Sequence, residues 1–259
     1  MDRWINRRQI LRYGLMGAGA ALASAIGSRA TSAQAADGLT IQSLGHTCFA
    51  FTGGGLRILT NPFNTLGCTA GYRSPNFTAD LVTISSQLLD EGFVSNLPGN
   101  PSLLFEPGTF EFRGNQFQGI RTAHDRFGGR RFGDNVVWRW KQGGISILHL
   151  GGIAAPLGVE EKILMGRPDV AIVPVGGGAK AYNAEEAKRA IESLQPKVVI
   201  PSQYRTAAAD SQCDLDGLEA FLNLMSGYDI QTLNTETMTL RPENLPPQGT
   251  LIRVLRHPA

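Results

Sequence analysis

The first half of the chain consists of short hydrophobic runs that alternate with polar positions and are separated by glycine-rich turns. Alternation with a period of two predicts β-strands, and glycine between two such runs predicts hairpins. The predicted strands cover residues 39–43, 48–52, 56–60, 80–85, 135–140 and 145–150, with a hairpin over 110–123 that breaks at 113–115.

The pattern changes in the second half, where buried strands alternate with helices. Fully hydrophobic runs at 170–175 and 198–200 predict interior strands. The clearest helix covers 184–194, because Asn183 and Glu186 have the spacing of a capping box and Pro196 follows its end. Further helices are predicted at 159–165 and 215–225, and a final strand at 251–255. Hairpins followed by alternating strands and helices predict two packed sheets with helices outside, an α/β sandwich.

The N-terminus reads as an export signal rather than as part of the fold. Arg7 and Arg8 precede an apolar stretch that ends in the sequence Ala-Gln-Ala at residues 33–35. This arrangement resembles a twin-arginine signal, which implies export of the folded protein by the twin-arginine machinery to the periplasm or the thylakoid lumen. We expect cleavage after Ala35 and a single mature domain over 36–259. An ordinary signal peptide and an uncleaved anchor are the alternatives.

Charge and cysteine content narrow the classes of function. The whole chain has 24 basic and 22 acidic residues, but five of the arginines lie in the predicted signal, so the mature part is slightly acidic. Nothing here indicates nucleic-acid binding, and no mature segment has the length of apolar sequence that spans a membrane. Of the three cysteines, Cys48 and Cys68 both lie near the first hairpin, and we expect them to form a disulfide if one forms.

Several segments, in order, resemble one known family. They are Leu-Gly-His-Thr-Cys-Phe at 44–49, Ile-Leu-Thr-Asn-Pro-Phe at 58–63, Asp-Val-Ala-Ile-Val-Pro-Val-Gly-Gly at 169–177 and Val-Val-Ile-Pro-Ser-Gln-Tyr-Arg-Thr at 198–206. Together they resemble the metallo-β-lactamase superfamily, in particular its ascorbate-lactonase-like branch of Zn-dependent hydrolases. The resemblance implies a four-layer αββα sandwich, and a cleft in which two zinc ions activate water.

The metal-binding loop departs from the pattern of that family. The family sequence Thr-His-x-His-x-Asp-His is matched here by Ser-Ser-Gln-Leu-Leu-Asp-Glu at 85–91. Ser86 and Leu88 therefore replace two histidines of the first zinc, and Glu91 replaces a histidine of the second. Asp90 is retained. A leucine has no donor atom, and a serine hydroxyl is a poor zinc ligand beside imidazole.

The remaining ligand positions are also largely substituted. His124 keeps the third histidine of the first zinc. Gly152 replaces the aspartate that bridges both metals in the family, and Gln203 replaces the last histidine. Since a catalytic zinc needs three good protein ligands, we expect no metal cofactor. The alternative is one divalent ion, zinc, manganese or magnesium, on Asp90, Glu91 and His124.

These substitutions favour an exported pseudoenzyme whose cleft binds a small molecule without catalysis. Arginines near His124 and Gln203 favour an anionic ligand. The expected ligand contacts are His46, Arg126, Gln203 and Arg205. The alternatives are a metal-dependent hydrolase with an atypical single-ion site, and purely structural roles in which Asp90 and Glu91 start a helix and His124 is a buried core histidine.

Overall fold

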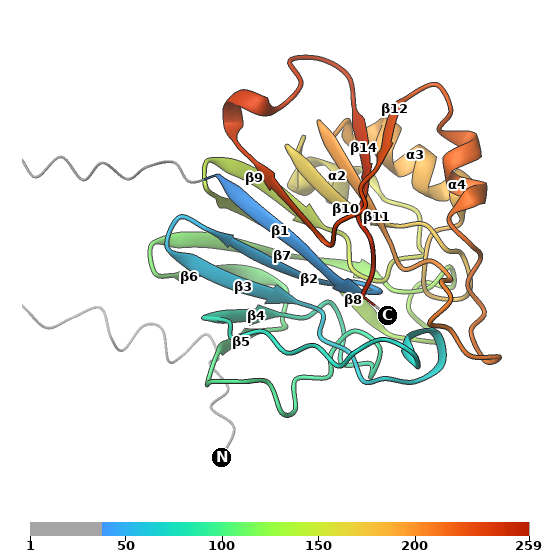
Figure 1. Cartoon of the computed structure of the whole chain (residues 1–259), viewed down its shortest axis with the longest axis horizontal. Coiled ribbons are helices and arrows are strands. Elements are labelled where there is room, and N and C mark those ends of the chain that lie inside the picture. The colour runs from blue at the N-terminus through green and yellow to red at the C-terminus, as the bar shows by residue number, and fades with distance from the viewer. Residues whose placement is uncertain (1–37, 259) are drawn as a thin grey trace, which may run out of the picture.

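The computed structural model describes residues 38–258, which form two β-sheets packed face to face (Figure 1). The predicted signal at 1–35 and its cleavage after Ala35 lie outside the described residues. The six-stranded sheet has the order β13 (Thr237–Leu240), β1 (Leu39–Gly45), β2 (Cys48–Gly53), β3 (Leu56–Thr60), β4 (Leu81–Thr83), β5 (Ser102–Leu104).

The second sheet has eight strands. Their order is β12 (Asp229–Thr232), β14 (Leu251–Val254), β11 (Val198–Ser202), β10 (Val170–Pro174), β9 (Ile145–His149), β8 (Asp134–Gln142), β7 (Asn115–Ala123), β6 (Gly108–Phe112). The strands from β12 to β9 pair in parallel, and those from β9 to β6 pair antiparallel. Strands β7, β9, β10 and β11 therefore run in one direction, and their carboxyl ends lie at the same edge.

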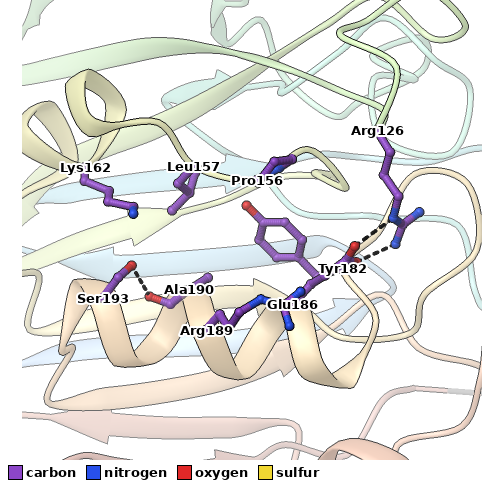
Figure 2. A pocket seen from close by; sticks show the side chains of 9 residues that line it. All are labelled: Arg126, Pro156, Leu157, Lys162, Tyr182, Glu186, Arg189, Ala190 and Ser193. Carbon is purple, nitrogen blue, oxygen red and sulfur yellow. Dashed lines mark hydrogen bonds and ion pairs between the residues drawn. The ribbon is translucent and has the colours of Figure 1, made fainter.

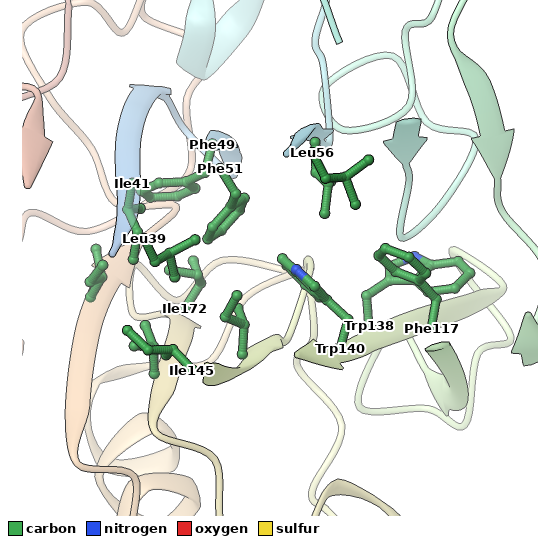
Figure 3. Close-up of a cluster of buried hydrophobic side chains, with 14 of the residues drawn as sticks. Leu39, Ile41, Phe49, Phe51, Leu56, Phe117, Trp138, Trp140, Ile145 and Ile172 are labelled. Carbon is green, nitrogen blue, oxygen red and sulfur yellow. The ribbon is translucent and has the colours of Figure 1, made fainter. Parts of the chain in front are cut away.

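Aromatic and aliphatic side chains fill the space between the sheets (Figure 3). Phe51 of β2 meets Trp140 of β8 edge to face, with ring centroids 5.0 Å apart. Trp138 lies on the same face of β8, and its indole N–H donates to the carbonyl oxygen of Ile84 at 2.9 Å. Alternate residues of each strand reach this core because side chains alternate between the two faces of a sheet.

The helices α2 (Val159–Met165), α3 (Ala184–Leu194) and α4 (Glu219–Leu224) cover the outer face of the eight-stranded sheet (Figure 1). Helix α3 begins as predicted: Asn183 accepts a hydrogen bond from the Glu186 amide, and Glu186 accepts one from the Asn183 amide, both at 2.9 Å. Loops and the short 3₁₀ helix η1 (Gly67–Thr69) cover the other sheet. A second 3₁₀ turn, η2, covers Pro242–Asn244. The predicted α/β sandwich is confirmed.

Some predicted elements differ from the structure. The helix predicted from residue 215 begins only at Glu219, because the preceding segment is extended: the Asp216 amide donates to Gly176 and its carbonyl accepts from Arg205. The short strands β5, β12 and β13 were not predicted, since each has few residues and little alternation. In the part of the chain that the structure describes, we find no helix with the length and apolarity to cross a membrane.

The expected Cys48–Cys68 disulfide is wrong. Cys68 instead bonds to Cys213, 145 residues further along the chain, while Cys48 is a free, fully buried thiol in β2. Closeness in sequence misled the prediction, because Cys48 points into the packing beneath the six-stranded sheet. Cys68, by contrast, lies in a surface turn beside the segment that precedes α4.

We expect that thiol counting on unfolded, unreduced protein will find one free thiol per chain, at Cys48. Replacing both bonded cysteines (Cys68→Ser and Cys213→Ser) should lower the free energy of unfolding by about 3–5 kcal/mol, because a long loop is no longer closed in the unfolded chain. Urea denaturation measures this, with disulfide-intact wild-type protein as the reference, and reduced wild-type protein should lose a similar amount. A disulfide-linked peptide that contains Cys48 would contradict the assignment.

Candidate functional site

The cleft lies where the segments that follow four strands meet. Glu91 follows β4, His124 directly follows β7, Gly152 follows β9 and Gln203 directly follows β11. Three of these strands end at the same edge of the eight-stranded sheet, and β4 brings its loop to that edge from the other sheet. Positions far apart in the sequence therefore converge, as in other clefts at the carboxyl ends of strands.

A buried ion pair occupies the centre of this cleft. His124 Nε2 lies 2.7 Å from Glu91 Oε1, and both side chains are 0 % exposed. The structure thus brings together two of the three predicted metal ligands, but it joins them directly to each other. Oxygen and nitrogen at this distance form a charge-assisted hydrogen bond, which leaves no room for an ion between them.

The second oxygen of Glu91 fills the space next to Gly152. Glu91 Oε2 accepts hydrogen bonds from the Gly152 amide at 3.0 Å and from the Ser85 hydroxyl at 2.7 Å. A Cβ atom at Gly152 would lie only 2.6 Å from that oxygen. The Glu91 carboxylate therefore fits here only because residue 152 is a glycine, which has no side chain to occupy the same space.

A neutral residue supports this pair from the other side. The Asn61 side chain donates to the Ser85 hydroxyl at 2.8 Å and accepts from the Ser85 amide at 2.9 Å. The Ser85 hydroxyl is therefore oriented to donate to Glu91. A chain of buried hydrogen bonds thus runs from β3 through the loop to His124, and this chain satisfies polar groups that would otherwise be costly to bury.

The two partners shift each other's ionisation. Burial alone would lower the pKa of His124, but the Glu91 carboxylate outweighs it and holds the pKa above its ordinary value. Burial alone would raise the pKa of Glu91, but His124 and the Ser85 hydroxyl hold it well below its ordinary value. Each partner therefore favours the charged form of the other, the imidazolium of His124 and the carboxylate of Glu91.

The third predicted ligand, Asp90, has a different partner. It pairs with Lys180, whose ammonium group also lies 5.8 Å from the centre of the Phe132 ring. Asp90 lies in a turn closed by the Gly92 amide and the Leu88 carbonyl, so no helix starts there. Sequence reasoning missed Lys180, since a lone lysine in the loop after Gly176–Gly178 carries no recognisable motif.

Two predicted ligand contacts, His46 and Gln203, lie side by side in the cleft. The Gln203 amide donates to the His46 carbonyl oxygen at 3.2 Å. Both side chains line a cavity of about 200 Å³, together with Asp90 and Lys180. His46 Nε2 lies 3.9 Å from Asp90 Oδ2, beyond hydrogen-bonding distance. Neither ring nitrogen of His46, nor Oε1 of Gln203, has a partner among the described residues.

The other two predicted contacts lie elsewhere. Arg126 lines a separate cavity of about 360 Å³ beside α3, where its guanidinium donates to Glu186 and to the carbonyl oxygens of Gly178 and Ala181 (Figure 2). An anion bound there would have to displace Glu186. Arg205 is exposed, and its backbone forms a bridge to Gly217.

The loop that follows His124 is shaped by Asp125. Its carboxylate accepts four backbone hydrogen bonds, at 2.8–3.2 Å, from the amides of Phe127, Gly129, Arg131 and Phe132. Burial would raise the pKa of Asp125, but these donors hold it below its ordinary value. The predicted arginine cluster here is thus part of a loop folded around one carboxylate.

The residues present do not fit a pair of metal ions. Leu88 offers no donor atom, and the Ser86 hydroxyl accepts from the Leu88 amide at 3.3 Å. Across residues 38–258, no three His, Cys, Asp or Glu side chains gather in a metal-binding arrangement. Each retained ligand is also already paired with another side chain of the protein. His124 pairs with Glu91, and Asp90 pairs with Lys180.

Comparison with known proteins agrees with this architecture. A family model described as a beta-lactamase superfamily domain matches residues 40–203. A UPF0173 metal-dependent hydrolase of Thermoplasma acidophilum is 23 % identical over 189 residues, which cover 62 % of this chain and 81 % of that protein. One from Thermococcus onnurineus is 26 % identical over 191 residues, 64 % of this chain and 84 % of its own.

Solved structures give the same picture. A Thermotoga maritima protein, titled as a candidate Zn-dependent hydrolase of the metallo-beta-lactamase superfamily, superposes with a TM-score of 0.66 and 28 % identity, covering 84 % of this chain and all of that one. An isothiocyanate hydrolase from Delia radicum gut bacteria has a TM-score of 0.57 and 12 % identity, over 78 % of this chain and 99 % of its own, and shares the fold alone.

The contact between Glu91 and Gly152 predicts coupled effects on stability. Glu91→Ala should cost about 3–5 kcal/mol, because it leaves His124 buried without a partner. Gly152→Ala should cost about 1–3 kcal/mol, because its Cβ would press on the carboxylate. In the double variant, the cost of Gly152→Ala should largely disappear. Urea denaturation of the wild type, the two single variants and the double variant measures this. Gly227→Ala, at a position with open space around it, is the matched control; additive costs would contradict the contact.

The ion pair also predicts a pH dependence of stability. The His124 pKa is raised above its ordinary 6.5, so its contribution is complete below pH 6.5 and is lost as pH rises through the folded-state pKa. The Glu91 pKa is lowered from 4.5, so its contribution is present above pH 4.5 and is lost as pH falls further. Urea unfolding should show that the free energy of unfolding of the wild type falls as pH rises above 6.5, and that this fall is absent in His124→Gln. A His124 imidazole that titrates below 6.5 by NMR would contradict this.

Proposed function

Because the chain belongs to the beta-lactamase superfamily, we propose that it keeps the cleft of this superfamily and binds a small molecule there, without metal ions and without hydrolysis. One observation carries the proposal: the Glu91 carboxylate, paired with His124, fills the space beside Gly152. In this arrangement His124, which matches a zinc-binding histidine of the family, hydrogen-bonds to a carboxylate of the protein itself.

The second ion pair supports the same proposal. Asp90 is the one retained carboxylate of the metal-binding loop, and the ammonium group of Lys180 neutralises it. Without a metal ion, the cleft has no group that lowers the pKa of water toward neutrality, as a bound zinc does. A serine nucleophile has no support either. The Ser85 hydroxyl donates to Glu91 and the Ser86 hydroxyl accepts from the Leu88 amide, so neither serine of this loop is hydrogen-bonded to a histidine that could activate it.

Export is part of the proposal and rests on the sequence of residues 1–35. A protein exported folded to the periplasm would meet an oxidising compartment, in which the Cys68–Cys213 disulfide is stable. The anionic ligand expected from Arg126 and Arg205 is not part of the proposal, because Arg126 lines a separate cavity and Arg205 is exposed.

A second candidate function is metal-dependent hydrolysis at a single ion. It is favoured by the names of the matched relatives, which are called metal-dependent hydrolases. A divalent ion on Asp90, Glu91 and His124 would have to displace the Lys180 ammonium from Asp90 and a proton from His124. The two candidates therefore differ in a measurable property, the metal content of the purified protein.

We expect protein purified without chelator to contain well below one zinc, manganese or iron ion per chain, because the retained ligands already have protein partners. Elemental analysis measures the metal content, and chelator should leave the melting temperature unchanged. A variant that restores the five substituted ligands (Ser86→His, Leu88→His, Glu91→His, Gly152→Asp and Gln203→His) is the positive control and should take up zinc. Near-stoichiometric metal in the wild type, lost in the double variant Asp90→Ala and His124→Ala, would overturn the proposal in favour of the second candidate.

A further inference from the structure

The cavity beside the ion pairs contains polar groups that the protein leaves without partners. His46 is 2 % exposed and Gln203 is 1 % exposed. Both ring nitrogens of His46 and Oε1 of Gln203 lack a hydrogen-bond partner among residues 38–258. Buried polar groups without partners destabilise a fold, and native proteins keep few of them. Three such atoms on two neighbouring side chains of one cavity therefore point to a molecule that binds them.

The backbone holds these two side chains in place at a cost. His46 has a φ of 54° and Gln203 a φ of 51°, in the left-handed region that residues other than glycine seldom adopt. The hydrogen bond from the Gln203 amide to the His46 carbonyl links the two strained residues directly. Strain of this kind gathers at ligand sites, where it aims side chains at what is bound.

The charges around the cavity argue against an anion. Two carboxylates, Asp90 and Asp214, line it, together with one ammonium group, that of Lys180. Since Lys180 and Asp90 pair with each other, the carboxylate of Asp214 leaves a net negative charge. A phosphate or carboxylate ligand would meet repulsion here. A ligand ammonium group would be repelled by the ammonium group of Lys180.

Hydroxyl groups suit these atoms best, because one hydroxyl both donates and accepts. The 3.9 Å gap between His46 Nε2 and Asp90 Oδ2 admits an oxygen that contacts both. Gln203 Oε1 accepts only, so it needs a second donor on the same ligand. The volume of about 200 Å³ limits the ligand to a small molecule.

We propose that this cavity binds a small, neutral, polyhydroxylated molecule, of the size of a polyol or a monosaccharide, through His46, Gln203 and the Asp90–Lys180 pair. The proposal rests on the proposed function, since a metal ion on Asp90 would rearrange the cavity. The Cys68–Cys213 disulfide joins two of the segments that line the cavity, the turn at Cys68 and the segment that carries Asp214, so these two segments are held together before the ligand arrives.

Calorimetric titration of the full mature protein tests this with three neutral probes: erythritol, D-xylose and myo-inositol. Inorganic phosphate, succinate and putrescine are the charged probes. We expect at least one neutral probe to bind at concentrations up to about 50 mM, a range that detects millimolar affinity, and no charged probe to bind. No binding by any neutral probe overturns the proposal. Binding of a charged probe that His46→Phe abolishes overturns the ligand class.

Two variants locate the binding. His46→Phe and Gln203→Met remove the unpartnered atoms but keep the approximate shape, so each should weaken binding of the neutral probe about tenfold or more. The melting temperature of the ligand-free protein should stay unchanged or rise, since a buried polar group without a partner is replaced by an apolar one. Gln231→Met, at an exposed position of β12, is the matched control and should change neither. Unweakened binding in both variants, or a fall of the melting temperature in both, would overturn the proposed site.

Elemental analysis of the same samples separates the two proposals. Metal-free protein that binds none of the neutral probes contradicts only the ligand class proposed for this cavity. Protein that holds a stoichiometric metal ion contradicts the proposed function itself, whatever the probes do.

Discussion

The cleft of this protein depends on a single buried ion pair between Glu91 and His124. Two charges inside a protein are unfavourable unless each faces an opposite charge and its remaining hydrogen-bonding positions are filled. The Ser85 hydroxyl and the Gly152 amide fill the remaining hydrogen-bonding positions of the Glu91 carboxylate. The pair joins the loop after β4, which belongs to one sheet, to the end of β7, which belongs to the other. It therefore connects the two sheets at the open edge of the sandwich, where the hydrophobic core ends.

The sequence was sufficient for the fold because the fold follows from local patterns. Alternation marked most strands, a capping box marked α3, and the ordered family segments indicated the sandwich. The sequence was also sufficient to show that a residue such as Leu88, at a ligand position of the family pattern, cannot bind zinc. It could not show which residues pair with His124 and Asp90, because these contacts join residues far apart in the chain. Glu91 and Gly152 are 61 positions apart, and their contact is visible only in the structure.

The same limit explains the other errors. The lysine that neutralises Asp90 lies 90 positions away in a loop without a motif, so no spacing rule could identify it. Cys213 is further still from Cys68, and nearness in sequence favoured the wrong partner. By contrast, His46 and Gln203 were predicted as ligand contacts from their positions in the family pattern, and the structure places them in one cavity. The sequence could not show that these two side chains lack hydrogen-bond partners, because that depends on which residues surround them in the folded protein.

The crosslink between Cys68 and Cys213 has a consequence for how molecules enter the cleft. It fastens the turn at η1 to the extended segment before α4, and residues of both line the cavity. Covalently joined walls cannot swing apart in the manner of a hinged lid. This side of the cavity therefore keeps its width, and a molecule that enters past these two segments must fit the space already between them.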